Sequence, residues 1–237
     1  MAAVAHRKGT DSRLVWDWPV RITHWLLVVS VAGSYVTHRL GAAQFRYHRW
    51  CGYTTLVLVT VRMAWGFLGP RHARFTSFVR GPAAVLRYFA GIVRGRATAF
   101  AGHNPAGGWM VLALLALLLG QALTGLFAND TIANTGPLYG YVMGHTSNQL
   151  TRWHRRLFAA LLIALALHVI AIAVHRLALK TSLVMPMLTG RKSASEVTAD
   201  EAIPGSRIGR WLLLLALAGG TLAVIVERAP EASLFAF

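Results

Sequence analysis

The stretch that decides the fold is residues 150–177, LTRWHRRLFAALLIALALHVIAIAVHRL. Most of it is apolar, and it is longer than the ~20 residues with which a helix crosses a bilayer. It also carries His154 and His168. A helix that turns ~100° per residue brings both side chains to nearly the same face, ~21 Å apart along its axis. One helix can therefore present an imidazole at each of two depths in a membrane.

Similar apolar blocks occur along the rest of the chain, in which 55% of the residues are hydrophobic and only 14% are charged. That composition is typical of an integral membrane protein. The blocks cover residues 19–37, 51–68, 108–128 and 153–177, with a shorter fifth block at 211–226. We therefore expect an all-α helical bundle of four core transmembrane helices and a fifth, C-terminal one. A helix lying on the lipid surface is the alternative for the fifth block.

The formal charge of +16 is distributed unevenly. Most Lys and Arg residues fall before the first block, between the second and third, and between the fourth and fifth. The positive-inside rule places these segments and the N-terminus in the cytoplasm. The expected organisation is a cytoplasmic segment at 1–18, the bundle at 19–180, a cytoplasmic loop at 181–207, and the fifth helix with an outer tail at 208–237. The charge does not require a nucleic-acid partner.

Two features limit the chemistry and the processing of the chain. Cys51 is the only cysteine, which excludes an internal disulfide, a CxxCH attachment site for c-type haem and a cysteine-ligated iron–sulfur cluster. The first residues contain no apolar core followed by a small-residue cleavage site, so we expect no removable signal peptide.

Alternating topology orders the histidines by depth. His24 lies early in the first span and His168 late in the fourth, so both are expected near the cytoplasmic side. His48, just ahead of the second span, and His154 are expected near the outer side. Imidazoles on facing helices are the axial ligands that haem takes from a bundle interior. The pattern predicts two haems, each held by two histidines and suited to electron transfer; His175 is the alternative to His168.

Several other residues have both a cofactor-binding and a structural interpretation. Gly52 either leaves room for a porphyrin or packs helices. Arg62 lies inside a span and binds a haem propionate or extends to the cytoplasmic interface. Arg49 and Arg155 bind propionates of the outer haem or mark the interface.

Two connections contain further patterns. Residues 81–97, GPAAVLRYFAGIVRGRA, repeat an arginine every seventh position and form either a short helix on the cytoplasmic membrane face or an ordinary charged connector. Residues 188–206 are polar and rich in small side chains, which predicts a mobile loop.

Five segments in combination resemble one known family. They are WDWPVRITHW, HRWCGYTTLVLVTVRMAWG, GHNPAGGWMVLALLALLLGQALTGLF, WHRRLF with LALHV, and MLTGRK, between residues 14 and 192. The family is the bacterial cytochrome b561 family, which includes the b-type cytochrome subunits of membrane-bound nickel–iron hydrogenases.

The resemblance implies an inner-membrane bundle with two b haems ligated by His24, His48, His154 and His168. It also implies electron exchange with quinone and with a second redox protein. A fifth span is more similar to the hydrogenase-type members, which favours a partner subunit. The resemblance also draws attention to GHNPAGGW, in which we expect His103 or Asn104 to lie near a quinone headgroup at the cytoplasmic side; the structural interpretation of these residues is a helix cap. Asp130, Tyr139 and Tyr141 of the outer loop 129–148 line a quinone site or a docking surface.

Three functions are consistent with these observations. The first is a di-haem cytochrome that carries electrons between the quinone pool and a periplasmic partner, either a c-type cytochrome or a hydrogenase-like enzyme. The second is a superoxide:quinone oxidoreductase, because exposed arginines at the outer end attract an anion. The third is a haem-free membrane anchor or transporter.

Overall fold

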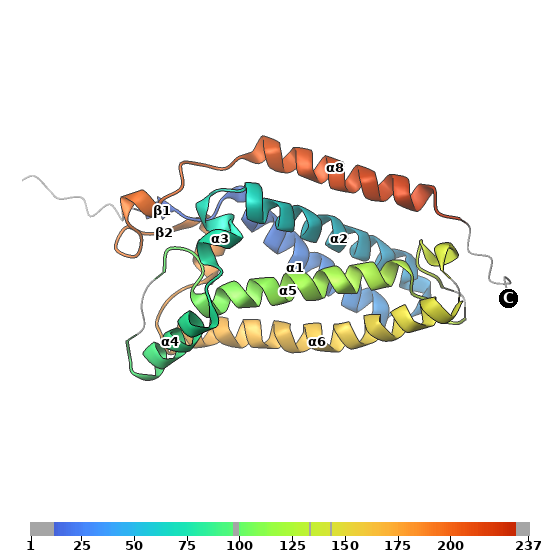
Figure 1. Ribbon diagram of the computed structural model, residues 1–237, viewed down its shortest axis with the longest axis horizontal. Coiled ribbons are helices and arrows are strands. Elements are labelled where there is room, and N and C mark those ends of the chain that lie inside the picture. Colours follow the sequence, from blue (N-terminus) through green and yellow to red (C-terminus); the bar gives the residue numbers. More distant parts are fainter. Residues whose placement is uncertain (1–11, 97–99, 133, 143, 231–237) are drawn as a thin grey trace, which may run out of the picture.

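A computed structural model describes residues 12–96, 100–132, 134–142 and 144–230 of the chain. Within these residues, five helices are long and apolar enough to cross a membrane (Figure 1). They are α1 (Trp18–Arg39), α2 (Phe45–Leu68), α5 (Pro105–Leu126), α6 (Gly144–Leu177) and α8 (Ile208–Glu227). The prediction of an all-α membrane bundle with a fifth C-terminal helix is confirmed. The basic residues Arg7 and Lys8 and the tail after Pro230 lie outside the described residues.

Each of the five helices begins before its apolar block, and α2 and α6 do so by the most residues. α2 begins at Phe45, after a 3-10 turn η1 (Ala42–Gln44), so His48 lies inside the helix instead of ahead of it. α6 begins at Gly144, which makes the end of the expected outer loop helical. The added residues include the basic side chains Arg46, Arg49 and Arg152 and several polar ones. Hydropathy therefore identifies the part of each helix that suits lipid, whereas the helix itself continues into the interface.

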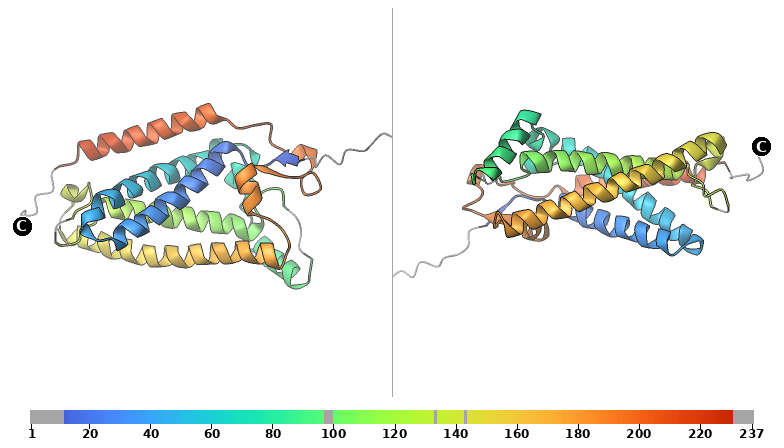
Figure 2. Two further views of the ribbon diagram at one scale, coloured as in Figure 1. Left: turned by 180° about the vertical axis from the view of Figure 1, so that it is seen from behind. Right: turned by 90° about the horizontal axis from the view of Figure 1, so that it is seen from below.

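The four helices α1, α2, α5 and α6 form the core of the bundle, and α8 packs outside them along α2 (Figures 1 and 2). α1 pairs with α2, α5 pairs with α6, and α2 also packs against α5. A cluster of Val59, Leu115, Leu118 and Leu161 fills the space where α2, α5 and α6 meet. Because lipid is as apolar as these side chains, close packing holds the helices together more than exclusion of water does.

The connections alternate between the two ends of the bundle. The N-terminal residues and the α2–α5 and α6–α8 connections gather at one end, here named the N-terminal end (Figure 1). The α1–α2 and α5–α6 connections and the end of α8 lie at the opposite end, here named the far end. The described parts of the three basic segments therefore share the N-terminal end.

The α6–α8 connection is more structured than the loop that its composition predicts. It contains α7 (Val184–Thr189), strand β2 (Arg191–Ser193) and the 3-10 turn η4 (Ala199–Glu201). β2 pairs antiparallel with β1 (Ser12–Leu14). Val197 and Ile203 are buried, and Val197 packs in a cluster with Val15, Trp65 and Trp211. The few apolar residues of this connection thus attach it to the N-terminal end of the bundle.

The α2–α5 connection also folds, into η2 (Arg71–Ala73), α3 (Phe75–Phe78) and α4 (Pro82–Val93). α4 is the short helix that was one of the two interpretations of residues 81–97. It buries none of its residues, and Leu86 and Val93 are 70% and 88% exposed. At the far end, the α5–α6 connection contains the turn η3 (Tyr139–Tyr141).

Candidate functional site

The first histidine pair joins α1 and α6 toward the N-terminal end. The ring centroids of His24 and His168 are 6.5 Å apart, with the ring planes tilted by 55°. Two imidazoles that bind one metal from opposite sides, each nitrogen ~2 Å from it, have ring centres roughly 6 Å apart. The Nδ1 atom of His24 is buried without a hydrogen-bond partner in the described structure. Buried polar atoms are rarely left so, and this one calls for a partner beyond the chain itself.

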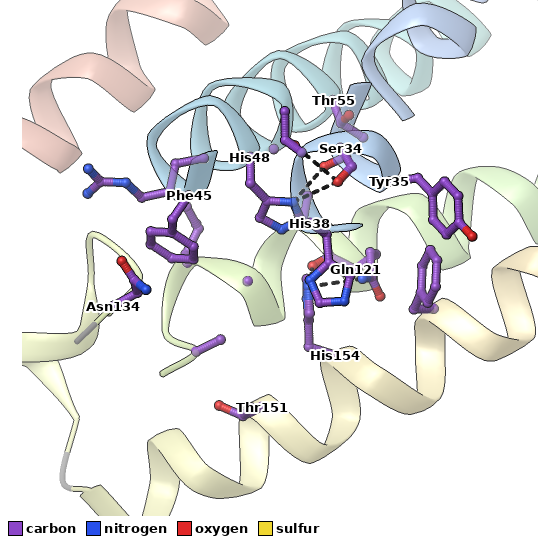
Figure 3. A pocket seen from close by; sticks show the side chains of 18 of the residues that line it. Ser34, Tyr35, His38, Phe45, His48, Thr55, Gln121, Asn134, Thr151 and His154 are labelled. Atoms are coloured by element: carbon purple, nitrogen blue, oxygen red, sulfur yellow. Dashed lines mark hydrogen bonds between the residues drawn. The ribbon is translucent and has the colours of Figure 1, made fainter. Parts of the chain in front are cut away.

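The second pair joins α2 and α6 toward the far end. The ring centroids of His48 and His154 are 6.4 Å apart, with the planes at 81°. The Nδ1–H of His48 donates to the carbonyl oxygen of Ser34, and the Nδ1–H of His154 donates to that of Gln121, each over 2.9 Å (Figure 3). Hydrogen bonds of this kind fix the tautomer and leave each Nε2 as the ligand atom.

The side chain of Gln121 occupies the space beside Nε2 of His154. Its amide nitrogen lies 3.0 Å from Nε2 of His154, while its Oε1 atom is buried without a partner among the described residues. A metal bound to His154 therefore requires the Gln121 amide to turn aside. His38 adds a third imidazole here; its ring centroid lies 6.0 Å from that of His48.

A cavity of about 390 Å³ surrounds the second pair. His48 and His154 both line it, and Figure 3 shows their side chains directed into the same space from α2 and α6. Gly52 lines it too, and a Cβ atom added there would meet nothing within 4 Å. At Gly125 an added Cβ would lie 3.0 Å from the His154 ring. One glycine thus leaves space in the cavity, and the other lets the imidazole approach α5. The volume is in the range of cofactor pockets.

The two arginines predicted near the outer pair line this cavity. Arg49 is only partly exposed, and its Nε atom is buried without a partner in the described part of the chain. Its guanidinium lies 5.6 Å from the centre of the Phe45 ring. Arg155 lines the same cavity from α6. Both are placed where they could pair with the acidic groups of a bound cofactor.

Arg62 is 7% exposed and does not extend to the protein surface, contrary to one of its two interpretations. It donates to the carbonyl oxygen of Ala73 over 3.3 Å. The charge of Asp17, buried to 1% exposure, acts on it as well. Burial raises the pKa of Asp17, although a hydrogen bond from Trp65 and the charge of Arg62 act in the opposite direction.

Asp17 is the residue that the sequence did not identify. It caps α1, since Oδ1 accepts from the backbone N–H of Val20, and Oδ2 accepts from the Trp65 indole over 2.9 Å. Its signal in the sequence is the motif WDWP, in a chain with only 8 acidic residues. An N-cap position alone explains an aspartate there. Its second role, as a charge beside Arg62, depends on the packing of α1 against α2.

His175 is held in a polar cluster instead of facing His24. Its Nε2 atom lies 3.1 Å from the hydroxyl of Tyr88 and 3.3 Å from the amide nitrogen of Asn104, and its Nδ1 lies 2.9 Å from the hydroxyl of Thr181. Both ring nitrogens are thus engaged. His24, by contrast, contacts His168.

Asn104 and His103 take different positions. Asn104 caps α5, accepting from the backbone N–H of Gly107 over 2.7 Å, as the structural interpretation predicts. Its amide nitrogen contacts His175 at the same time. His103 packs between the rings of Trp16 and Phe78, with centroids 4.7 Å and 4.5 Å away. Burial, reinforced by the charge of Arg62, lowers the pKa of His103 to about 3, so the ring is neutral.

In the α5–α6 connection, Asp130 lines the cavity and accepts hydrogen bonds from the backbone N–H groups of Ile132 and Asn134, both over 2.9 Å. The hydroxyl of Tyr141 donates instead to the carbonyl oxygen of Arg228 at the end of α8. Of the loop residues singled out in the sequence, Asp130 is therefore the one placed at the histidine pair. Tyr139 is not among the residues lining the cavity.

A family model described as prokaryotic cytochrome b561 matches residues 15–190. The chain belongs to this family. The resemblance carried by the sequence motifs is thereby confirmed. A search of curated proteins found no match.

Membership of the cytochrome b561 family makes the chain a membrane-bound b-type cytochrome of bacteria that binds haem and transfers electrons. The match spans α1 to α7, so α8 lies beyond the cytochrome b561 region. The histidine pairs, the unpartnered buried nitrogens and the cavity fit b-type haem, which is held without covalent attachment through cysteine.

Proposed function

We propose that the protein is a di-haem cytochrome that transfers electrons across the inner membrane between the quinone pool and a periplasmic redox partner. His24 and His168 are the axial ligands of one haem, and His48 and His154 of the other. The observation that carries this proposal is the use of α6 in both pairs, each with ring centroids about 6.5 Å apart. A haem iron with two histidine ligands supplies one-electron transfer and keeps no open coordination position.

The protein supplies orientation and charge. The carbonyls of Ser34 and Gln121 hold the rings of the outer pair, and Gly52 and Gly125 give the space that the cofactor and the ligand ring need. The guanidiniums of Arg49 and Arg155 pair with propionates at the outer haem. Arg62 already donates to the carbonyl oxygen of Ala73 and lies near the charge of Asp17. Pairing of Arg62 with a propionate of the inner haem would add to these two interactions.

The N-terminal end of the bundle faces the cytoplasm. It gathers the basic connections, as the positive-inside rule requires. Residues 1–18 and 181–207 then lie on the cytoplasmic side, 19–180 form the haem-binding unit, and 208–237 form the fifth helix and its periplasmic tail. The outer haem lies nearest the periplasm, where a c-type cytochrome or hydrogenase-like enzyme exchanges electrons with it.

Quinone reacts at the cytoplasmic side, beside Asn104. Reducing a quinone to a quinol takes two electrons and two protons, so the site needs groups that hold or pass protons. The amide of Asn104, the imidazole of His175 and the hydroxyl of Tyr88 meet within hydrogen-bond distance. His103 is less suited to direct contact, because two aromatic rings flank it.

The test is anaerobic mixing of the oxidised, purified protein with a short-chain quinol while haem absorbance is followed. We expect the quinol to reduce the haems. Asn104→Ser should slow that reaction at least tenfold while leaving reduction by dithionite complete, because serine retains the helix cap but removes the amide. Gln44→Ser, at the far end, is the control. Wild-type rates in Asn104→Ser would show that the quinone site is not beside Asn104. If quinol does not reduce the oxidised haems and quinone does not oxidise the dithionite-reduced haems, the proposed function is contradicted.

The same purified protein also tests the alternative function, a superoxide:quinone oxidoreductase. Consumption of superoxide by the purified protein without a partner, faster than in a haem-free control, would favour it. The arginines lining the outer cavity, Arg49 and Arg155, are the groups that would attract the anion.

A further inference from the structure

A second cavity, of about 280 Å³, lies at the N-terminal end, and none of the four paired histidines lines it. It forms between the turn after α2 and the segment that leads into α8, two parts of the chain that are distant in sequence. Three arginines line it, Arg71, Arg74 and Arg207, together with the hydroxyl-bearing residues Thr76 and Ser77. None of the described lining residues is acidic. We name it the arginine pocket.

The arginines are partly held in place and keep donors available. Arg74 donates through Nε to the carbonyl oxygen of Gly69 over 2.7 Å, and Arg71 through Nη1 to that of Asp200 over 3.0 Å. Each bond uses one of five N–H donors of a guanidinium. The Asp200 carboxylate offsets part of the charge of Arg71. Glu201, whose carboxylate accepts from Thr198, offsets a further part of it. The pocket thus has three guanidiniums against two neighbouring carboxylates. The net charge at the pocket stays positive.

The start of α8 adds a further preference for an anion. Arg207 is the N-cap residue of this 20-residue helix, and no side chain caps it. The first backbone N–H groups of a helix lack partners within it, and the helix dipole favours negative charge there. The arginines and the helix end therefore favour the same kind of ligand, one with anionic oxygens.

The position relative to the membrane identifies the source of those oxygens. The pocket lies where α2 ends and α8 begins, the level at which both spans leave the lipid. Large apolar side chains next to it are exposed, Phe67 and Leu68 on α2 and Ile208 and Leu212 on α8. Acyl chains could lie against these residues while a phosphate occupies the pocket. Basic pockets of this kind between spans bind acidic headgroups.

We infer that the arginine pocket binds the phosphate headgroup of an anionic phospholipid, whose acyl chains lie along α2 and α8. The bound lipid adds a further contact between α8 and the cytochrome b561 region, beside the direct packing of α8 along α2. This inference does not depend on the haem ligands, the quinone site or the direction of electron flow.

The experiment is native mass spectrometry of the haem-loaded protein in detergent, titrated with phosphatidylglycerol or with phosphatidylcholine of the same acyl chains. The test variant is Arg71→Gln/Arg207→Gln. The control is Arg87→Gln/Arg210→Gln, which removes the same charge from residues that do not line the pocket. The haem absorbance of each variant verifies that it is folded.

We expect wild type and control to retain phosphatidylglycerol at least tenfold better than phosphatidylcholine, and the test variant to lose that preference. An equal preference in all three proteins would overturn the inference. A third titration uses inorganic phosphate. Binding of phosphate that depends on Arg71 and Arg207, without a preference for the anionic lipid, would assign the pocket to a free anion and overturn the lipid assignment.

Discussion

His168 and His175 lie about two turns apart on α6 and differ in what they contact. His168 faces His24, whereas His175 is engaged by Tyr88, Asn104 and Thr181. We therefore expect His168→Ala to lose one of two haems and His175→Gln to keep both, as counted by the pyridine haemochrome method. Full haem content in His168→Ala, or loss of a haem in His175→Gln, would reverse the assignment of the inner ligand.

Gly52 distinguishes a haem cavity from ordinary helix packing. A Cβ atom at this position meets nothing within 4 Å, and the position borders the cavity, so the protein itself leaves space there. If a porphyrin fills that space, Gly52→Leu should lower the haem content toward one per chain while the protein still folds.

The matched control is Gly219→Leu on α8, where an added Cβ also meets nothing within 4 Å. It should keep the wild-type haem content. Unchanged haem content in Gly52→Leu would show that the cofactor does not occupy the space beside this glycine.

At the residue scale, the sequence identifies the histidines because ionisable side chains within an apolar span are rare and usually functional. It also indicates that Arg62 needs a partner. It does not identify Asp17 as a neighbour of Arg62. Contacts between residues so distant in the chain depend on how α1 and α2 pack, which no local pattern encodes.

At the scale of elements, Asp17 joins the start of α1 to α2 through Trp65 and the charge of Arg62. Asp17→Asn leaves the buried guanidinium without its counter-charge, and we expect it to lower the free energy of unfolding by about 3 kcal/mol. Thermal or denaturant unfolding in detergent measures this loss.

The double variant Asp17→Asn/Arg62→Met removes both charges. It should lower the free energy of unfolding by less than the sum of the two single changes, because neither charge is then left buried alone. Additive costs would show that Asp17 and Arg62 do not stabilise one another.

Hydropathy predicts all five spans, but not the structure at their ends. The β1–β2 pair and the buried Val197 were missed, because three-residue strands far apart in the sequence carry no periodic signal. Hydropathy does not predict the early starts of α2 and α6 for a different reason: their first residues include basic and polar side chains, so the apolar block begins later than the helix.

At the scale of the whole molecule, the N-terminal end should be sensitive to acid. Burial lowers the pKa of His103 to about 3 and also lowers that of His72. Below a pH of about 6.5 the unfolded chain therefore binds more protons than the folded one, so stability falls as the pH drops from there toward 3.

His103→Phe removes one of these groups while keeping a ring between Trp16 and Phe78. We expect its unfolding temperature to fall less than that of wild type between pH 7.5 and pH 5, which are chosen to bracket ~6.5. Parallel curves for the two proteins would show that His103 does not contribute to the acid sensitivity.

Two haems stacked along α6 are the central claim, and a dithionite-reduced minus oxidised visible spectrum with a pyridine haemochrome count per chain tests it most directly. We expect two b haems with low-spin bands, as histidine ligands on both faces require. One haem per chain would contradict one of the two pairs. A protein that folds and binds no haem would contradict the entire electron-transfer assignment.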